Sequence, residues 1–287
     1  MTNDIEIELD LSNNDYFKLS KIKYLKLKTI SDYVFKLANE TLLEIIENEN
    51  QEEWIESRYG IVKKLWYKGK NGINLMRIDF AWDNNDNLKV LELNTSSQGG
   101  WILTGITDKE SSANKIGIPL APDSKIYVNY LLKKLGMKIV FIVSRYDYNK
   151  ELDILLKQIK ELGGKAIIIK IDENCIQEII DFNPTGIFWK STSILVNNYK
   201  LVIEISKLNL QQIPSFESIF ISGDKSFLEI LKKKDIMNVI PKTYIIDKNN
   251  IYKNLNILNK DDSVLKPGDL ARGENIIFGK NCNNDTW

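Results

Sequence analysis

Residues 77–100 read RIDFAWDNNDNLKVLELNTSSQGG, and this stretch decides the expected organisation of the chain. Side chains alternate in character along residues 77–82, with the period of two that is typical of a β-strand. The run DNNDN at residues 83–87 favours a turn, and residues 89–94 then read as a second strand. The stretch therefore predicts a β-hairpin that leads into a glycine-bearing loop.

One face of this hairpin is expected to carry a compact set of oxygen donors. Glu92 and Asn94 are two residues apart, so their side chains leave the same face, and Arg77 lies on the partner strand. Magnesium prefers such hard oxygen ligands, usually with substrate phosphates completing its coordination. The loop TSSQGG, residues 95–100, has the glycines that let backbone amides approach an anion. Two interpretations stay open: a magnesium–phosphate site, or the solvated face of a half-buried sheet.

The composition narrows the class of protein. A chain of 287 residues with 43% hydrophobic content can build two or three lobes with real cores. Basic and acidic residues balance at 39 each, so nothing points to a nucleic acid as the main partner. No apolar run is long enough to span a bilayer and the start is no signal peptide, which favours a cytoplasmic protein. Cys175 and Cys282 lie far apart and indicate neither a disulfide framework nor a zinc site.

The sequence contains no histidine. This absence excludes Ser-His-Asp and Cys-His nucleophilic catalysis and histidine-ligated zinc chemistry. An enzyme with this composition has carboxylates, lysines, arginines, oxygen-held metals and main-chain donors to work with. Phosphoryl transfer fits that set of groups, because it depends on positioning and charge neutralisation.

The sequence on either side of the hairpin predicts helices and then an alternating pattern. Residues 1–70 read as helical, with Ser31 as the cap of a helix over residues 31–50 and the helical pattern continuing from Glu52. A further helix is expected over residues 125–135, before Gly136. The following strand–helix–strand order predicts a Rossmann-like parallel sheet that lacks the G-x-G-x-x-G fingerprint. Its expected strands are residues 138–143, 165–171 and 185–190, and its expected helices are residues 149–162 and 175–181.

Two cations follow strands of this predicted sheet. Arg145 comes shortly after one strand and Lys190 ends another. Ligands of parallel sheets gather at the carboxyl ends of the strands, so both residues are candidates for holding a substrate carboxylate. A solvated cation at a strand end is the alternative for each.

The last part of the sequence predicts a further helix and a second hairpin. Gly223 or Asp224 is expected to cap a helix that runs through Lys232; the P-loop pattern is not satisfied there. A short strand within residues 238–247, a helix over residues 249–258, and a strand–loop–strand unit over residues 262–280 are expected to follow. Lys266 leaves the first strand of that unit before a glycine-containing loop, a placement that suits a phosphate clamp.

Taken together, these motifs resemble those of the circularly permuted ATP-grasp ligases typified by eukaryotic-type glutathione synthetase. The most specific match is R-x-D-F, an acidic turn, and E-x-N-T-x-S-x-G-G, seen here in residues 77–100. SGDKSFLEIL resembles the lysine-bearing helix start that contacts nucleotide in that family, and VLKPGDLARGEN resembles its phosphate-lysine loop. The resemblance implies an α/β (α+β) fold that is ATP-grasp-like, with an N-terminal helical and hairpin region, a Rossmann-like substrate lobe and a partial ATP-grasp lobe.

The resemblance also implies roles for individual residues. It places magnesium at Glu92 and Asn94, and ATP phosphates at these two residues and at Lys225 and Lys266. It assigns binding of the peptide or acid substrate to Arg77, Ser96 or Ser97, and Lys190. It assigns catalytic roles to Arg77 and Lys266. Lys190 replaces an arginine of the family, which changes how a carboxylate is held. The family's triple glycine appears as residues 270–273, and only Asp269 and Glu274 lie near its loop glutamate.

The implied activity is an ATP- and Mg²⁺-dependent carboxylate–amine ligase that forms an amide through an acylphosphate. Its partners would be a small carboxylic acid or peptide and an amine, with no nucleic acid and no membrane. The family's chain continues beyond the point where this one stops, so a fragment, a chain completed by a second copy or another polypeptide, and an inactive binding or partner subunit all stay open. A Rossmann-like sensing lobe with a structural hairpin is the rival outside this family. Three regions are expected, at residues 1–135, 136–215 and 216–287.

Overall fold

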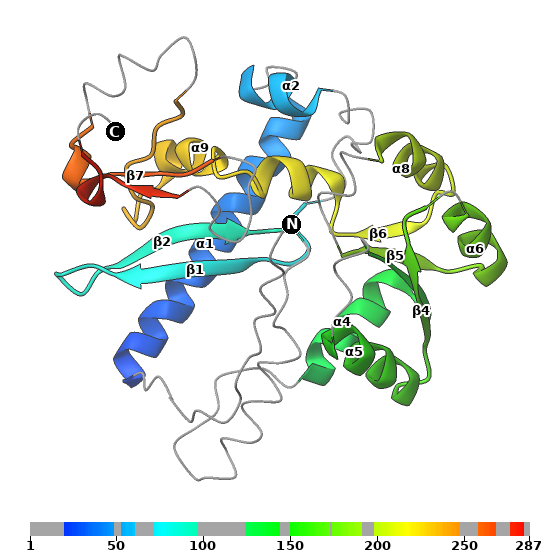
Figure 1. Ribbon diagram of the computed structural model, residues 1–287. Helices are drawn as coiled ribbons and strands as arrows, with labels where there is room; N and C mark the ends of the chain where they lie inside the picture. The colour runs from blue at the N-terminus through cyan, green and yellow to red at the C-terminus, as the bar shows by residue number, and fades with distance from the viewer. Residues whose placement is uncertain are drawn as a thin grey trace.

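The structure is a computed structural model that describes residues 20–48, 53–60, 72–96, 124–143, 150–172, 174–190, 198–246, 258–267 and 276–283. Its helices are α1 (Lys21–Glu47), α2 (Glu53–Tyr59), α4 (Ser124–Leu135), α5 (Lys150–Glu161), α6 (Cys175–Phe182), α8 (Tyr199–Ser206), the π-helix η2 (Ser218–Ser222), α9 (Phe227–Lys234), and the 3₁₀ turns η3 (Lys260–Asp262) and η4 (Gly279–Asn281). Its strands are β1 (Arg77–Trp82), β2 (Leu88–Asn94), β3 (Lys138–Val143), β4 (Lys165–Lys170), β5 (Gly186–Trp189), β6 (Gln211–Ile213), β7 (Val264–Leu265) and β8 (Ile277–Phe278). This mixture of helices with a four-stranded parallel sheet confirms the expected α/β class (Figure 1).

The predicted hairpin is confirmed, and it contains a bulge. β1 and β2 pair antiparallel with Asp79 opposite Glu92 and Phe80 opposite Val90, so Leu91 is an extra residue in β2. The Asp83 carboxylate accepts hydrogen bonds from the amides of Asn85 and Asn87 within the turn. The inward face of the hairpin packs on α1, which crosses behind it in Figure 1.

Helix α1 begins earlier than the sequence suggested. Ser20 is its N-cap, and its Oγ accepts a hydrogen bond from the Lys23 amide at 3.2 Å. Ser31 therefore lies inside the helix, and its assignment as the cap was wrong. Residues 21–30 contain no glycine or proline that would prevent the helix from extending toward Ser20. The buried side of α1 includes Val34 and Leu42.

The Rossmann-like sheet is confirmed as parallel, with strand order β4-β3-β5-β6. Helices α4 and α5 contribute to the hydrophobic cluster on one face, and α6 and α8 contribute to the cluster on the other (Figure 1). The expected region 1–135 includes α4, which packs against this sheet. The cluster on the α6 and α8 face continues into α1, the β1–β2 hairpin and α9, so one core joins the sheet to the hairpin.

The segment after the sheet differs from expectation in two places. The helix α9 starts at Phe227, because the Asp224 carboxylate bonds the Ser226 amide in a turn that precedes the helix. The strand expected within residues 238–247 is wrong for residues 238–246, which form no strand. Here the Ile240 amide donates to the buried Asp235 side chain, and Pro241 has no amide proton, so neither residue can donate a hydrogen bond to a neighbouring strand.

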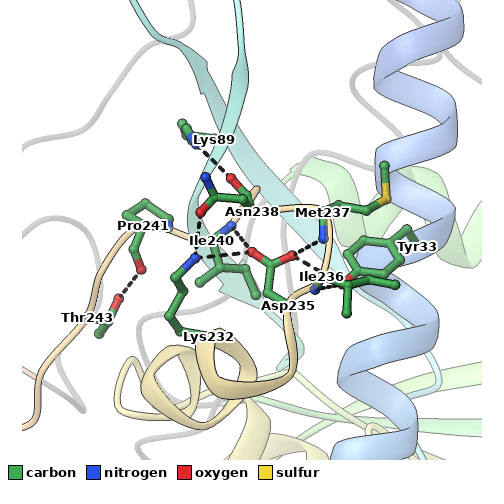
Figure 2. A network of polar contacts seen from close by, with 10 residues as sticks. All are labelled: Tyr33, Lys89, Lys232, Asp235, Ile236, Met237, Asn238, Ile240, Pro241 and Thr243. Carbon is green, nitrogen blue, oxygen red and sulfur yellow. Dashed lines mark hydrogen bonds and ion pairs between the residues drawn. The ribbon is translucent and has the colours of Figure 1, made fainter.

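Figure 2 shows how Asp235 anchors this irregular segment. Its carboxylate accepts hydrogen bonds from the Tyr33 hydroxyl of α1 at 3.1 Å and the Ile240 amide at 2.7 Å, and it lies 3.7 Å from Lys232 Nζ. Lys89 Nζ of β2 donates to the Asn238 carbonyl at 2.6 Å. The turn after α9 is therefore tied to both α1 and the hairpin.

Toward the end of the chain, the expected second hairpin is confirmed as the antiparallel pair β7 and β8. Most of the helix expected over residues 249–258 falls outside the described residues. No helix in the described part of the chain is both long enough and apolar enough to cross a membrane.

Candidate functional site

Two lysines from distant segments lie against β2 at its bulge. Lys225 Nζ, from the turn before α9, is 3.6 Å from Glu92 Oε1. Lys266 Nζ, from the residue after β7, donates a hydrogen bond to the Leu91 carbonyl at 3.2 Å. Bulges often re-aim side chains beside active sites, and this one falls between Glu92 and Val90. The structure thus brings Glu92, Lys225 and Lys266 to one place on the hairpin.

The polar face of the hairpin contains a carboxylate that sequence reasoning left without a role. Asp79 lies opposite Glu92 in the ladder, so both side chains leave the same face. The Arg77 guanidinium donates to both oxygens of Asp79, at 2.9 Å and 3.2 Å. Asn94 Nδ2 also donates to Asp79 Oδ2, at 3.2 Å. The hairpin register alone would have shown that Asp79 belongs with Glu92 and Asn94.

These residues have the chemistry that a magnesium ion requires. Glu92 and Asp79 supply carboxylate oxygens and Asn94 supplies an amide oxygen, all on one face. Within the described ranges, no three His, Cys, Asp or Glu side chains gather closely enough to hold a metal. A magnesium ion at the hairpin would therefore depend on oxygens of its ligand to complete its coordination, as is usual for magnesium at phosphate sites. In this structure the Arg77 guanidinium balances the charge of Asp79, and the Lys225 ammonium balances the charge of Glu92.

A buried network of hydroxyl groups fixes the end of β2. Thr95 Oγ1 donates to the Ser218 carbonyl of η2 at 2.7 Å and accepts from Ser222 Oγ at 2.9 Å. Ser218 Oγ returns a hydrogen bond to the Thr95 carbonyl at 3.1 Å. This network sets the point from which Ser96 continues the chain. Ser97 lies outside the described residues.

Lys190 lies at the carboxyl edge of the parallel sheet, directly after β5. Its backbone amide donates to the Ile142 carbonyl, and its Nζ is 3.7 Å from Glu151 Oε2, with only 10% and 6% of the two side chains exposed. β3 and β5 are neighbours here, and the chain leaves β3 toward β4 on the opposite side, which makes this the switch point where parallel sheets bind ligands. No motif of the sequence predicted Glu151 as the partner of Lys190. Arg145 lies outside the described residues.

Tyr127 adds a third titratable group near this pair. Desolvation, and then the charge of Glu151, raise the pKa of Tyr127 above its ordinary value of 10.0. Tyr127 belongs to the side of α4 that packs against the sheet. Charged side chains at the carboxyl edge of the sheet are therefore poorly hydrated.

No protein-family model matches the chain, and a comparison with curated proteins finds no relative. The assignment to the ATP-grasp ligases therefore stays a prediction that rests on the motifs of the sequence.

Proposed function

We propose that this protein is an ATP- and Mg²⁺-dependent carboxylate–amine ligase of the glutathione-synthetase-like, circularly permuted ATP-grasp type. One observation carries the proposal: Lys225 lies beside Glu92, and Lys266 lies against Leu91, the residue before it in β2. An anionic ligand with several charged oxygens gives that arrangement a purpose.

Different residues at the hairpin would bind the magnesium ion and the phosphate groups of ATP. Glu92 and Asn94 would hold magnesium, with Asp79 beside them. Lys225 and Lys266 would neutralise charge that develops on transferred phosphate oxygens, a contribution that preorganised donors make without rearrangement. In this assignment Lys225 exchanges the Glu92 carboxylate for a phosphate oxygen when nucleotide arrives.

The substrates would meet the protein at the hairpin and at the sheet. Arg77 and Ser96 lie at the end of the hairpin face and would hold the acid, with Ser97 expected in the same loop. Lys190 and Glu151 together present one positive and one negative group at the sheet edge. A substrate carboxylate would pair with Lys190 there.

The reaction needs no nucleophile from the protein. ATP would supply the γ-phosphoryl group, which passes to a carboxylate oxygen of the acid and gives an acylphosphate and ADP. The amine nitrogen would then form a bond to the acyl carbon as the carbon–oxygen bond to phosphate breaks, releasing phosphate and a proton. Positioned cations are sufficient for both steps, in agreement with a chain that lacks histidine.

Nucleotide titration tests the proposal. The non-hydrolysable ATP analogue AMP-PNP is titrated calorimetrically into the protein with Mg²⁺ and with EDTA, and ADP release from ATP is followed separately. Binding is expected only with Mg²⁺, and Glu92→Gln is expected to weaken it by at least about tenfold, or roughly 1.4 kcal/mol. Glu44→Gln is the matched control, because Glu44 also pairs with a lysine, Lys234, but on α1. Equal binding by Glu92→Gln and the unaltered protein would show that the magnesium assignment is wrong.

The same titration separates the ligase from a binding or partner subunit. The lack of a third acidic, cysteine or histidine ligand at the described part of the hairpin favours this second candidate. Nucleotide binding without ADP release in the presence of amino acids as acid and amine would support it.

A further inference from the structure

A fully buried carboxylate supports the turn that carries Lys225. Asp224 Oδ2 accepts hydrogen bonds from Arg58 Nη1 at 2.6 Å and from the Tyr59 hydroxyl at 2.8 Å, and its side chain has no exposed surface. Asp224 Oδ1 accepts from the Ser226 amide at 2.7 Å. Arg58 Nη1 also donates to Ser226 Oγ at 3.0 Å. Arg58 thus holds the residues on both sides of Lys225.

The groups that hold this turn come from α2, which is distant in sequence. The Arg58 guanidinium carbon lies 5.6 Å from the centre of the Trp54 ring, and the Tyr59 ring lies 5.3 Å from the Phe220 ring. These aromatic contacts hold the end of α2 in the position from which Arg58 and Tyr59 contact Asp224. At the start of the turn, Gly223 has no space for a Cβ, which would clash with the Ile219 carbonyl oxygen. The turn is therefore held in one conformation, in which Lys225 faces Glu92.

Asp235, at the other end of α9, is a natural comparison. It too is a fully buried carboxylate that accepts from a tyrosine hydroxyl and from backbone amides and lies near a cation (Figure 2). Its neighbours, however, are Lys234 and Ile236, and neither is placed at the hairpin site. Loss of either aspartate removes a similar set of bonds, but only Asp224 lies next to Lys225.

We propose that Asp224 and Arg58 are positioning residues, which hold the turn of residues 223–226 so that the Lys225 ammonium stays at the Glu92 end of the hairpin. This inference rests on the proposed function, in which Lys225 meets nucleotide phosphate. The hydrogen bonds from Arg58 to Asp224 and Ser226 both come from Nη1. A lysine at position 58 has one such nitrogen and can replace it in part, whereas methionine cannot.

A double-mutant cycle tests the positioning role. The affinity for Mg²⁺–AMP-PNP is measured for Asp224→Asn, Lys225→Met and the double variant. Asp224→Asn is expected to weaken binding by about tenfold, within the coupling range of contacting residues. In the Lys225→Met background it is expected to add less than about a factor of two, because the group that it positions is gone. Arg58→Met should behave like Asp224→Asn, and Arg58→Lys should recover most of the affinity.

Asp235→Asn is the control for simple destabilisation. It is expected to lower the melting temperature about as much as Asp224→Asn and to leave the nucleotide affinity unchanged. Additive effects of Asp224→Asn and Lys225→Met, or an equal loss of affinity in Asp235→Asn, would overturn the positioning role.

A second measurement needs no nucleotide. The acetylation rate of Lys225 by acetic anhydride is measured by mass spectrometry, with the exposed Lys21 as internal reference. Lys225 is only 13% exposed, so its release by Asp224→Asn should raise this rate severalfold, whereas Asp235→Asn should not. If no variant binds nucleotide and the rate still rises, the positioning holds and the ligase proposal fails. An unchanged rate in Asp224→Asn would refute the positioning itself.

Discussion

Two lysine–glutamate pairs of almost equal length lie in different surroundings. Lys225 Nζ is 3.6 Å from Glu92, and Lys190 Nζ is 3.7 Å from Glu151. Glu92 keeps 28% of its side chain exposed, whereas Glu151 keeps 6%. Water can therefore compensate Glu92 if its lysine moves away, but it can hardly compensate Glu151. Of the two, the hairpin pair is the better suited to exchanging its partner for a ligand, because water can take the place of its lysine.

The two pairs also differ in how the chain builds them. Lys190 directly follows β5 and Glu151 lies at the start of α5, so both come from the same parallel sheet and its covering helices. Lys225 reaches Glu92 only because α9 and the hairpin share a core with α1. The sheet pair depends on a local architecture, and the hairpin pair depends on the docking of separate segments.

The largest effect is expected from removing the cation of the sheet pair. Lys190→Met leaves the buried Glu151 carboxylate without this cation, and losing one partner of a buried pair typically costs about 3–5 kcal/mol. Urea denaturation measures the change in the free energy of unfolding. The double variant Glu151→Gln/Lys190→Met removes both charges of the pair and should recover most of the loss. Equal stability of the single and double variants would show that the pair is not effectively buried.

The corresponding change at the hairpin should separate stability from activity. Lys225→Met should alter the free energy of unfolding by no more than about 1 kcal/mol, because Glu92 is partly solvated. ATP turnover should lose about 2.7–4 kcal/mol of transition-state stabilisation, by analogy with loss of an oxyanion donor. Steady-state ADP release measures ATP turnover, and urea denaturation of the same samples measures the free energy of unfolding. Turnover that survives in Lys225→Met would remove this lysine from the proposed reaction.

The sequence predicted what depends on local pattern. The alternation and the DNNDN turn are sufficient for the β1–β2 hairpin, and buried strand patterns with intervening helices are sufficient for the parallel sheet. What it missed depends on contacts between distant residues. Asp224 was read as a helix cap, yet it binds Arg58 and Tyr59 of α2. Residues 238–246 have an apolar, strand-like composition, but Asp235 takes the Ile240 amide that a sheet would need.

The hydroxyl network at the end of β2 should contribute less to the free energy of unfolding than the sheet pair does. Thr95→Val keeps the shape of the side chain but removes the donor to the Ser218 carbonyl and the acceptor for Ser222. Leaving buried polar groups without partners costs about 1–3 kcal/mol. Denaturation of Thr95→Val, Ser222→Ala and the double variant measures this cost and the coupling between the two hydroxyls. Strictly additive losses would mean that Thr95 and Ser222 do not stabilise the end of β2 together.

The smallest effect is expected at high pH and returns to the sheet pair. Because desolvation and Glu151 raise the pKa of Tyr127, the folded state holds this proton more tightly than the unfolded state does. The resulting stability is present below pH 10 and is lost as the pH rises beyond it, at up to about 1.4 kcal/mol per pH unit. Tyr127→Phe cannot ionise, so its free energy of unfolding should fall less steeply between about pH 10 and 11. Tyr130→Phe is the comparison: burial also raises the pKa of Tyr130, without a contribution from Glu151, so this variant should flatten the slope in the same direction. Equal slopes for Tyr127→Phe and the unaltered protein would show that Tyr127 ionises as readily in the folded state as in the unfolded one, and that the carboxyl edge of the sheet is better hydrated than its packing indicates.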